Sequence, residues 1–127
     1  MTPETPDYTT RTFQFACQIV DLFRVLMRTR TFPFHIARQI LKAGTSIGAN
    51  LEEAKASQSR KELASKFSIA LKEARETKYW LRLIVATGLA ERALIAKPLR
   101  ESDELVAILT VSYRKLKVKK GNKLPRQ

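Results

Sequence analysis

Apolar residues recur every three or four positions through most of this chain, the spacing typical of helices with one buried face. In the first such segment the apolar positions are Phe15, Ile19, Leu22, Phe23 and Leu26. Pro33 then interrupts the pattern, and a proline disfavours helical backbone in the residue before it. The pattern predicts a first helix from about Thr10 to Arg30.

The period resumes after this proline and predicts a second helix from about Phe34 to Ala56. Gly44 and Gly48 lie inside it, one helical turn apart. A glycine costs a helix interior about 1 kcal/mol relative to alanine. Close approach of a neighbouring backbone would compensate for that cost, so the pair predicts a tight helix crossing.

The third helix is marked at both ends. Ser59 and Glu62 have the spacing of a capping box, in which a hydroxyl and a carboxylate each accept a hydrogen bond from a free backbone amide. The helix should continue to Thr87, and Gly88 is placed to end it in a left-handed conformation.

A connection from Leu89 to Lys97 is expected next, with Pro98 in the first turn of a fourth helix. Acidic residues lie near the start of this helix and basic ones near its end, which suits its dipole. Ile108 and Val111 point away from the internal seam, which also predicts an apolar stripe for contact with a second copy of the chain.

No strand pattern or repeat competes with these helices. The sequence therefore predicts an all-α fold, an up-and-down antiparallel four-helix bundle, as one domain over residues 10–118 of the 127-residue chain. Residues 1–9 are expected to form a loose leader and residues 119–127 a basic disordered tail.

Polar residues lie on or beside the predicted seam. Asn50, Glu53, Glu76 and Thr77 are predicted to form a hydrogen-bonded network that fixes helix register. The alternative makes Glu53 and Glu76 a pair of metal ligands, as in di-metal bundles. The Glu-x-x-His partners are missing and the chain has one histidine, so neither a metal nor a cofactor is expected.

Positive charge is the strongest compositional feature, with a formal net charge of +12. Part of it lies on the third helix, where Arg75, Lys78 and Arg82 accompany Tyr79 and Trp80. Cations interleaved with aromatic rings can hold phosphate and stack bases. The alternative is that the rings pack against the first helix or a neighbouring subunit while the cations pair with Glu73 or Glu76.

More than half of the excess lies at the C-terminal end, which has seven basic and no acidic residues from position 114 to 126. This segment is either a solvated extension or a non-specific phosphate anchor. The candidate phosphate-binding residues there are Arg114, Lys115, Lys117, Lys119 and Lys120.

No apolar run approaches the length of a membrane span, and the N-terminal residues lack the layout of a secretory signal. The single Cys17 cannot form an internal disulfide and is expected to pack in the first helix. A cytoplasmic protein is therefore expected. No phosphate loop, zinc spacing or catalytic triad is present, so the chain is not expected to be an enzyme.

Two segments resemble a known family. Thr45 to Ala54 reads TSIGANLEEA, and Ser68 to Thr77 reads SIALKEARET. Together they resemble the bacterial four-helix bundle proteins encoded in intervening sequences of 23S ribosomal RNA genes, over roughly Phe13 to Lys117. The resemblance implies an up-down-up-down bundle that forms ring-shaped homopentamers, with no established activity for most members. A distant relative, the accessory protein of diversity-generating retroelements, works with a reverse transcriptase and nucleic acid.

Two functions follow as hypotheses. One is a non-enzymatic, homo-oligomeric accessory protein that binds RNA or DNA through the cations of the third helix and the tail. The other is a structural adaptor that docks an unidentified protein and does not bind nucleic acid.

Overall fold

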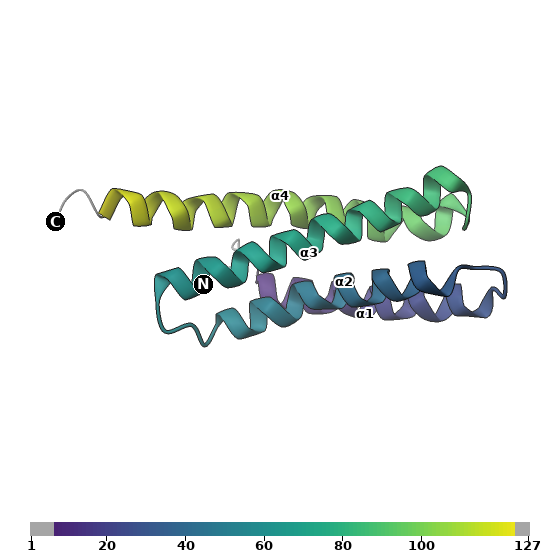
Figure 1. Cartoon of the computed structure of the whole chain (residues 1–127), viewed down its shortest axis with the longest axis horizontal. Coiled ribbons are helices and arrows are strands. Elements are labelled where there is room, and N and C mark those ends of the chain that lie inside the picture. The colour runs from purple at the N-terminus through teal and green to yellow at the C-terminus, as the bar shows by residue number, and fades with distance from the viewer. Residues whose placement is uncertain (1–6, 124–127) are drawn as a thin grey trace.

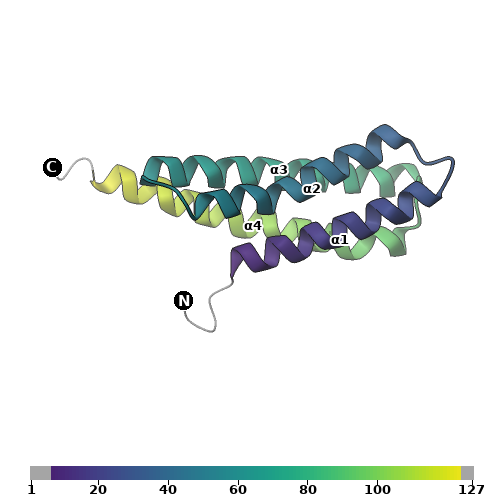
Figure 2. The same ribbon diagram turned by 90° about the horizontal axis from the view of Figure 1, so that it is seen from below.

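The computed structural model describes residues 7–123, the last five by their backbone alone. Four helices make up the described part of the chain, in which no strand occurs. They are α1 (Tyr8–Arg28), α2 (Phe34–Ala54), α3 (Arg60–Thr87) and α4 (Arg92–Lys123). Each helix is antiparallel to the next, as Figures 1 and 2 show, and the predicted all-α four-helix bundle is confirmed. None of these helices is long and apolar enough to cross a membrane.

The first helix begins two residues earlier than predicted because Asp7 caps it. The Asp7 carboxylate accepts from the backbone amides of Thr9 and Thr10, at 3.1 and 3.3 Å. The hydroxyl groups of Thr10 and Thr9 also donate to it, and these bonds lower the pKa of Asp7 from 3.8 to about 2. Residues 1–6 of the predicted leader lie outside the described residues.

The predicted ends of the third helix are confirmed. Ser59 Oγ accepts from the Glu62 amide at 3.0 Å, and the Glu62 carboxylate accepts from the amide of Gln58 at 2.6 Å. Gly88 ends α3 with φ of 70°, and the Leu89 amide donates back to the Ile84 carbonyl at 3.2 Å. This is the backward hydrogen bonding of a left-handed helix terminus.

The predicted start of the fourth helix is wrong. α4 begins at Arg92, so Pro98 lies inside the helix rather than in its first turn. The earlier start places Ile95, which is fully buried, on the inner face of α4. A proline in a helix removes one backbone hydrogen bond. Burial of Ile95 and of the proline ring itself offsets this loss.

At its other end α4 continues to Lys123, through positions predicted to be disordered tail. Residues 124–127 lie outside the described part. Figure 1 shows the end of α4 extending past the ends of the other helices.

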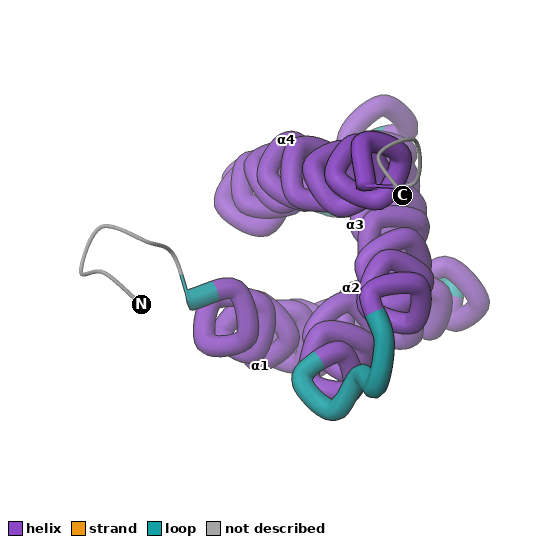
Figure 3. The backbone as a smooth tube through the Cα atoms, turned by 90° about the vertical axis from the view of Figure 1, so that its left-hand side faces the viewer, coloured by secondary structure: helices purple, strands orange, loops and turns teal. Residues whose placement is uncertain are grey.

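The helices pack in sequence order. Consecutive helices are in contact along their lengths, whereas α1 and α4 touch at few positions. Figure 3, a view along the bundle, shows the four helices in a C-shaped arrangement in which α1 and α4 face each other across the opening. A continuous apolar core fills the interior. Its fully buried members include Ile19, Ile40, Ile47, Leu81, Ile84 and Leu109.

The predicted tight crossing occurs between α1 and α2. A Cβ atom added at Gly44 would lie 2.7 Å from Cγ1 of the buried Ile19. One added at Gly48 would lie 3.2 Å from the carbonyl oxygen of Thr12. The two glycines thus allow α2 to approach both a side chain and the backbone of α1.

Candidate nucleic-acid interface

A groove between α3 and α4 gathers two of the three cations predicted to bind phosphate on α3. The tight turn at Gly88 places the last turns of α3 beside the first turns of α4 (Figure 1). Lys78 and Arg82 of α3 therefore meet Arg92 and Arg100 of α4. The groove has a volume of about 430 Å³. Its apolar lining consists of Val85, Ala96 and Leu99.

Negative charge in this groove comes from one residue. Asp103 lines it and pairs with Lys78, with 2.6 Å between Nζ and Oδ1. Within the described part of the chain, no carboxylate oxygen lies within 4 Å of the Arg82, Arg92 or Arg100 guanidinium. The groove thus carries four cations against one carboxylate, a formal charge of +3. Guanidinium groups with no anionic partner are well suited to bind phosphate.

Arg75, the third predicted cation of α3, lies two turns before Arg82 and is exposed. It does not line the groove but shares one helix face with Arg82 by its spacing of seven residues. Tyr79 lies between the two arginines and is 55% exposed. The three cations predicted on α3 therefore lie in or beside one groove.

Sequence reasoning missed Arg92 and Arg100. Arg92 falls in the connection predicted from Leu89 to Lys97, where no helix face is expected. The available signal was the Gly88 terminus, which indicates a short connection and hence an α4 that begins close to Arg82. The spacing of Arg92 and Arg100 by eight residues then places both on one side of α4.

The basic residues near the end of α4 form a second, separate region. Arg60 Nε of α3 donates to the Leu116 carbonyl at 3.3 Å, so this part of α4 lies beside the start of α3. Leu116 is 13 residues from Asp103, or about 20 Å along the helix axis. Arg114 and Lys115 line a shallow surface with Val111 and Val118. The tail and the α3 cations therefore do not form a single site.

Three further predicted tail residues lie on α4, and the side chain of one of them is described. Lys117 lies close to Tyr113, with its Nζ 5.8 Å from the ring centroid. Lys119 and Lys120 belong to α4, but their side chains lie outside the described part.

The predicted polar network is not formed. Asn50 Nδ2 donates to the Ser46 carbonyl of its own helix at 2.8 Å, and Thr77 donates to the Glu73 carbonyl at 2.8 Å. A helical backbone carbonyl within reach satisfies these groups without a cross-helix partner.

The two predicted carboxylates of that network also have other partners. Glu53 accepts from Lys66 Nζ at 2.6 Å, and Glu76 accepts from Trp80 Nε1 at 3.3 Å. Glu76 also faces Glu73. Burial, together with the charge of Glu76, raises the pKa of the Glu73 carboxyl.

The remaining predicted residues also have definite positions. Ile108 is half-buried and Val111 is 52% exposed, so the stripe predicted for self-association is open at Val111.

Cys17 is exposed, so its predicted packing role is wrong, because α1 turns that position away from the core. Among the described residues, no three His, Cys, Asp or Glu side chains come together as metal ligands.

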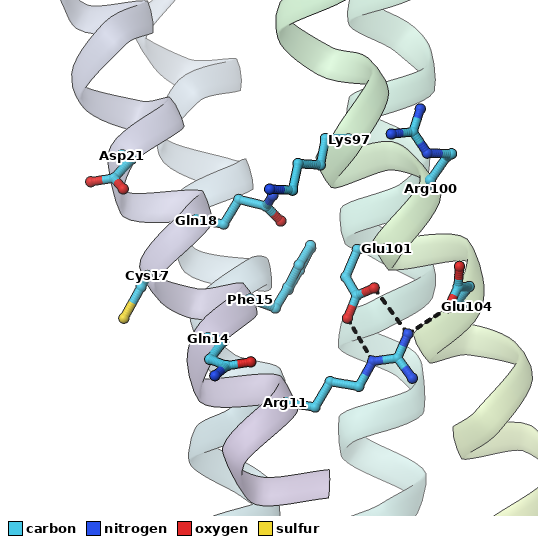
Figure 4. A pocket seen from close by; sticks show the side chains of 10 residues that line it. All are labelled: Arg11, Gln14, Phe15, Cys17, Gln18, Asp21, Lys97, Arg100, Glu101 and Glu104. Carbon is cyan, nitrogen blue, oxygen red and sulfur yellow. Dashed lines mark hydrogen bonds and ion pairs between the residues drawn. The ribbon is translucent and has the colours of Figure 1, made fainter. Parts of the chain in front are cut away.

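A second groove, of about 580 Å³, lies between α1 and α4 and is shown in Figure 4. Arg11 crosses from α1 and donates to both carboxylate oxygens of Glu101, at 2.7 and 3.0 Å, and also to Glu104. The Glu101 hydrogen bonds, with those of Glu104, raise the pKa of Arg11. The lining of this groove has three cations and three carboxylates, so its charges balance; one of the cations, Arg100, also lines the α3/α4 groove.

The comparisons with known proteins agree with this fold. The model of the family described as 23S rRNA-intervening sequence protein matches residues 6–111. The chain belongs to this family. A crystal structure of a protein of unknown function from the S23 ribosomal protein family of Bacteroides thetaiotaomicron VPI-5482 is similar to it, with 38% identity and a TM-score of 0.78. That similarity covers 84% of this chain and 97% of the other. No curated protein matches the chain.

Membership of the 23S rRNA-intervening sequence protein family confirms the resemblance carried by the TSIGANLEEA and SIALKEARET segments, both of which lie inside the matched range. Neither segment contains Arg92 or Arg100, while Lys78 follows the second segment directly and Arg82 lies four residues after Lys78.

Proposed function

We propose that this chain is a non-enzymatic accessory protein that binds nucleic acid through phosphate contacts in the α3/α4 groove. The observation that carries the proposal is a set of three guanidinium groups in one groove, those of Arg82, Arg92 and Arg100, which have no ion-pair partner within residues 7–118. Cations that neutralise phosphates release condensed counterions, and this release drives binding of nucleic acid without sequence preference. The family's description mentions a ribosomal RNA, which makes RNA the first ligand to test.

The proposal includes self-association. Val111 and Val118 are 52% and 59% exposed on the part of α4 that lines a shallow surface with Arg114 and Lys115. A second copy of the chain that covered these valines would remove apolar surface from water. Copies of the groove in one assembly would act together on a long nucleic acid, because linked weak sites bind more tightly than separate ones.

The test is the salt dependence of binding, measured by fluorescence anisotropy of labelled mixed-sequence RNA and DNA. Affinity should fall linearly on a plot of its logarithm against the logarithm of salt concentration. The double variant Arg82→Gln/Arg92→Gln should reduce that slope by about 1.4–1.8, since each lost phosphate contact removes roughly 0.7–0.9.

The matched control is Arg24→Gln/Arg28→Gln, which removes the same charge from exposed positions of α1. Equal loss of affinity in both double variants would mean that net charge, and not the groove, governs binding. Light scattering on wild type and Val111→Glu tests the assembly. A monomeric wild type would overturn the self-association.

The alternative function is a protein-partner adaptor, which the same exposed valines favour. The adaptor hypothesis predicts no salt-dependent binding of RNA or DNA by the wild type. That result would replace the nucleic-acid proposal.

A further inference from the structure

We infer that the rim of the α3/α4 groove takes unpaired nucleotides, with a base stacked on Tyr79 and the adjoining phosphates on Arg75 and Arg82. The inference rests on the proposed function and adds the class of nucleic acid: single-stranded segments in preference to duplex.

The first observation is the position of the ring. Tyr79 lies four residues after Arg75 and three before Arg82, the two spacings that make side chains neighbours on a helix surface. Its side chain is 55% exposed although it is large and aromatic. Within the described part of the chain, neither arginine has a carboxylate oxygen within 4 Å. An open ring therefore lies between two guanidinium groups that are available to phosphate.

The second observation is that neighbouring rings support Tyr79 in place. Its ring packs edge to face with Trp80, with centroids 5.3 Å apart and planes at 74°. Trp80 in turn packs against the core, donates to Glu76 at 3.3 Å, and meets the ring of His35 on α2 at 6.4 Å. A ring already held by its neighbours loses little conformational freedom when a ligand stacks on it.

The third observation concerns which nucleic acid can use such a ring. In a duplex the bases are stacked on one another, so a surface ring reaches only the sugar and phosphate edges. An unpaired base offers a face, and stacking on a protein ring is tolerant of base identity. The combination of cations and an exposed ring therefore favours single strands, whereas the cations of the groove alone would serve both forms.

Phe13 offers a matched control within the chain. It is 65% exposed on α1. Its neighbours one turn away are Thr9, Thr10, Ala16 and Cys17, none of them a cation. It supplies an exposed ring without adjacent guanidinium groups.

The experiment compares four proteins: the wild type, Tyr79→Leu, Tyr79→Phe and Phe13→Leu. For each, the affinity is measured at one salt concentration for a labelled single-stranded uridine-rich RNA and for an RNA duplex of equal length. Tyr79→Leu should weaken single-strand binding about tenfold, the loss expected for one stacked base. Duplex binding should not change. Tyr79→Phe and Phe13→Leu should both resemble the wild type.

Two further readings separate stacking from a general loss of charge or structure. The salt slope of Tyr79→Leu should equal that of the wild type, because no phosphate contact is removed. Trp80 is the only tryptophan in the chain, and its fluorescence should change when single-stranded RNA binds the wild type. Equal helical circular dichroism in all four proteins establishes that each is folded.

The possible outcomes are distinct. If Tyr79→Leu binds single strands as tightly as the wild type does, or loses duplex and single-strand affinity equally, the inference is wrong while the proposed function stands. If the wild type binds neither RNA in a salt-dependent way, the proposed function itself fails.

Discussion

The two grooves that flank α4 share Arg100 and contain similar numbers of cations, but they differ in what their other cations contact. In the α1/α4 groove, Arg11 is held by Glu101 and Glu104, and the lining charges sum to zero. In the α3/α4 groove, Asp103 is the one acidic residue, and it neutralises Lys78. A count of basic residues therefore does not identify a binding surface. The cations that form no ion pair with the described residues are the ones available to a ligand.

Under the proposed function, the difference also separates a structural role from a role in binding. Arg11 supplies the ion pairs that join α1 to α4, at an interface where the two helices otherwise touch little. A weaker link runs from Ser112 of α4 to the Tyr8 hydroxyl of α1 at 3.3 Å. We therefore expect variants of the α1/α4 groove to change stability and variants of the α3/α4 groove to change affinity.

Charge reversal should produce the largest effect. Arg82→Glu/Arg92→Glu changes the formal charge of the α3/α4 groove from +3 to −1. Affinity for RNA at low salt should fall by more than about 100-fold, because two phosphate contacts are replaced by repulsion. Anisotropy titration measures this loss. The control is Lys97→Glu in the α1/α4 groove, and a comparable loss there would remove the contrast between the grooves.

Loss of the Arg11 ion pairs should have the next largest effect. Arg11→Met should lower the free energy of unfolding by about 1–2 kcal/mol, because it leaves the partly buried Glu101 carboxylate without its charged partner and also removes the contact with the exposed Glu104. Chemical denaturation measures the change. Arg11→Lys should recover little, since an ammonium cannot reproduce the two-point contact with Glu101. An RNA affinity that fell in parallel with stability would contradict the division of roles.

A gain of function should follow from Asp103→Asn. The Asp103 carboxylate holds the Lys78 ammonium at 2.6 Å, so it competes with any phosphate that approaches that side chain. Its removal should raise RNA affinity about threefold while changing stability by less than about 0.5 kcal/mol, as expected for an exposed ion pair. Glu101→Gln is the matched change in the other groove and should not raise affinity. An unchanged affinity in Asp103→Asn would place phosphate away from Lys78.

The smallest effect should come from the cap that orders the first turn of α1, where Arg11 lies. The pKa of Asp7 is lowered to about 2, so its ionised form is favoured by folding. Its contribution is therefore complete above about pH 4 and is lost as the pH falls to about 2. Melting temperatures of wild type and Asp7→Ala should differ at pH 5 and converge near pH 2. A difference that persisted at the lower pH would exclude the carboxylate as its cause.

Much of the fold follows from local pattern alone. The number of helices, the capping box at Ser59 and the left-handed end at Gly88 depend on residues within one or two turns of each other. Gly44 and Gly48 also predict a close helix crossing, although their spacing does not identify α1 as the helix that is crossed.

The sequence by itself therefore determined the helices, most of their ends and the excess of positive charge. Tertiary structure decided the α4 start at Arg92, where burial of Ile95 outweighed the preference of proline for a first turn. It also decided which charges are neutralised. Arg11 and Arg82 look alike in the sequence. In the fold, Arg11 pairs with two carboxylates, whereas Arg82 lines a groove with three other cations. Such pairing depends on the rotation and register of one helix against another, which local periodicity does not specify.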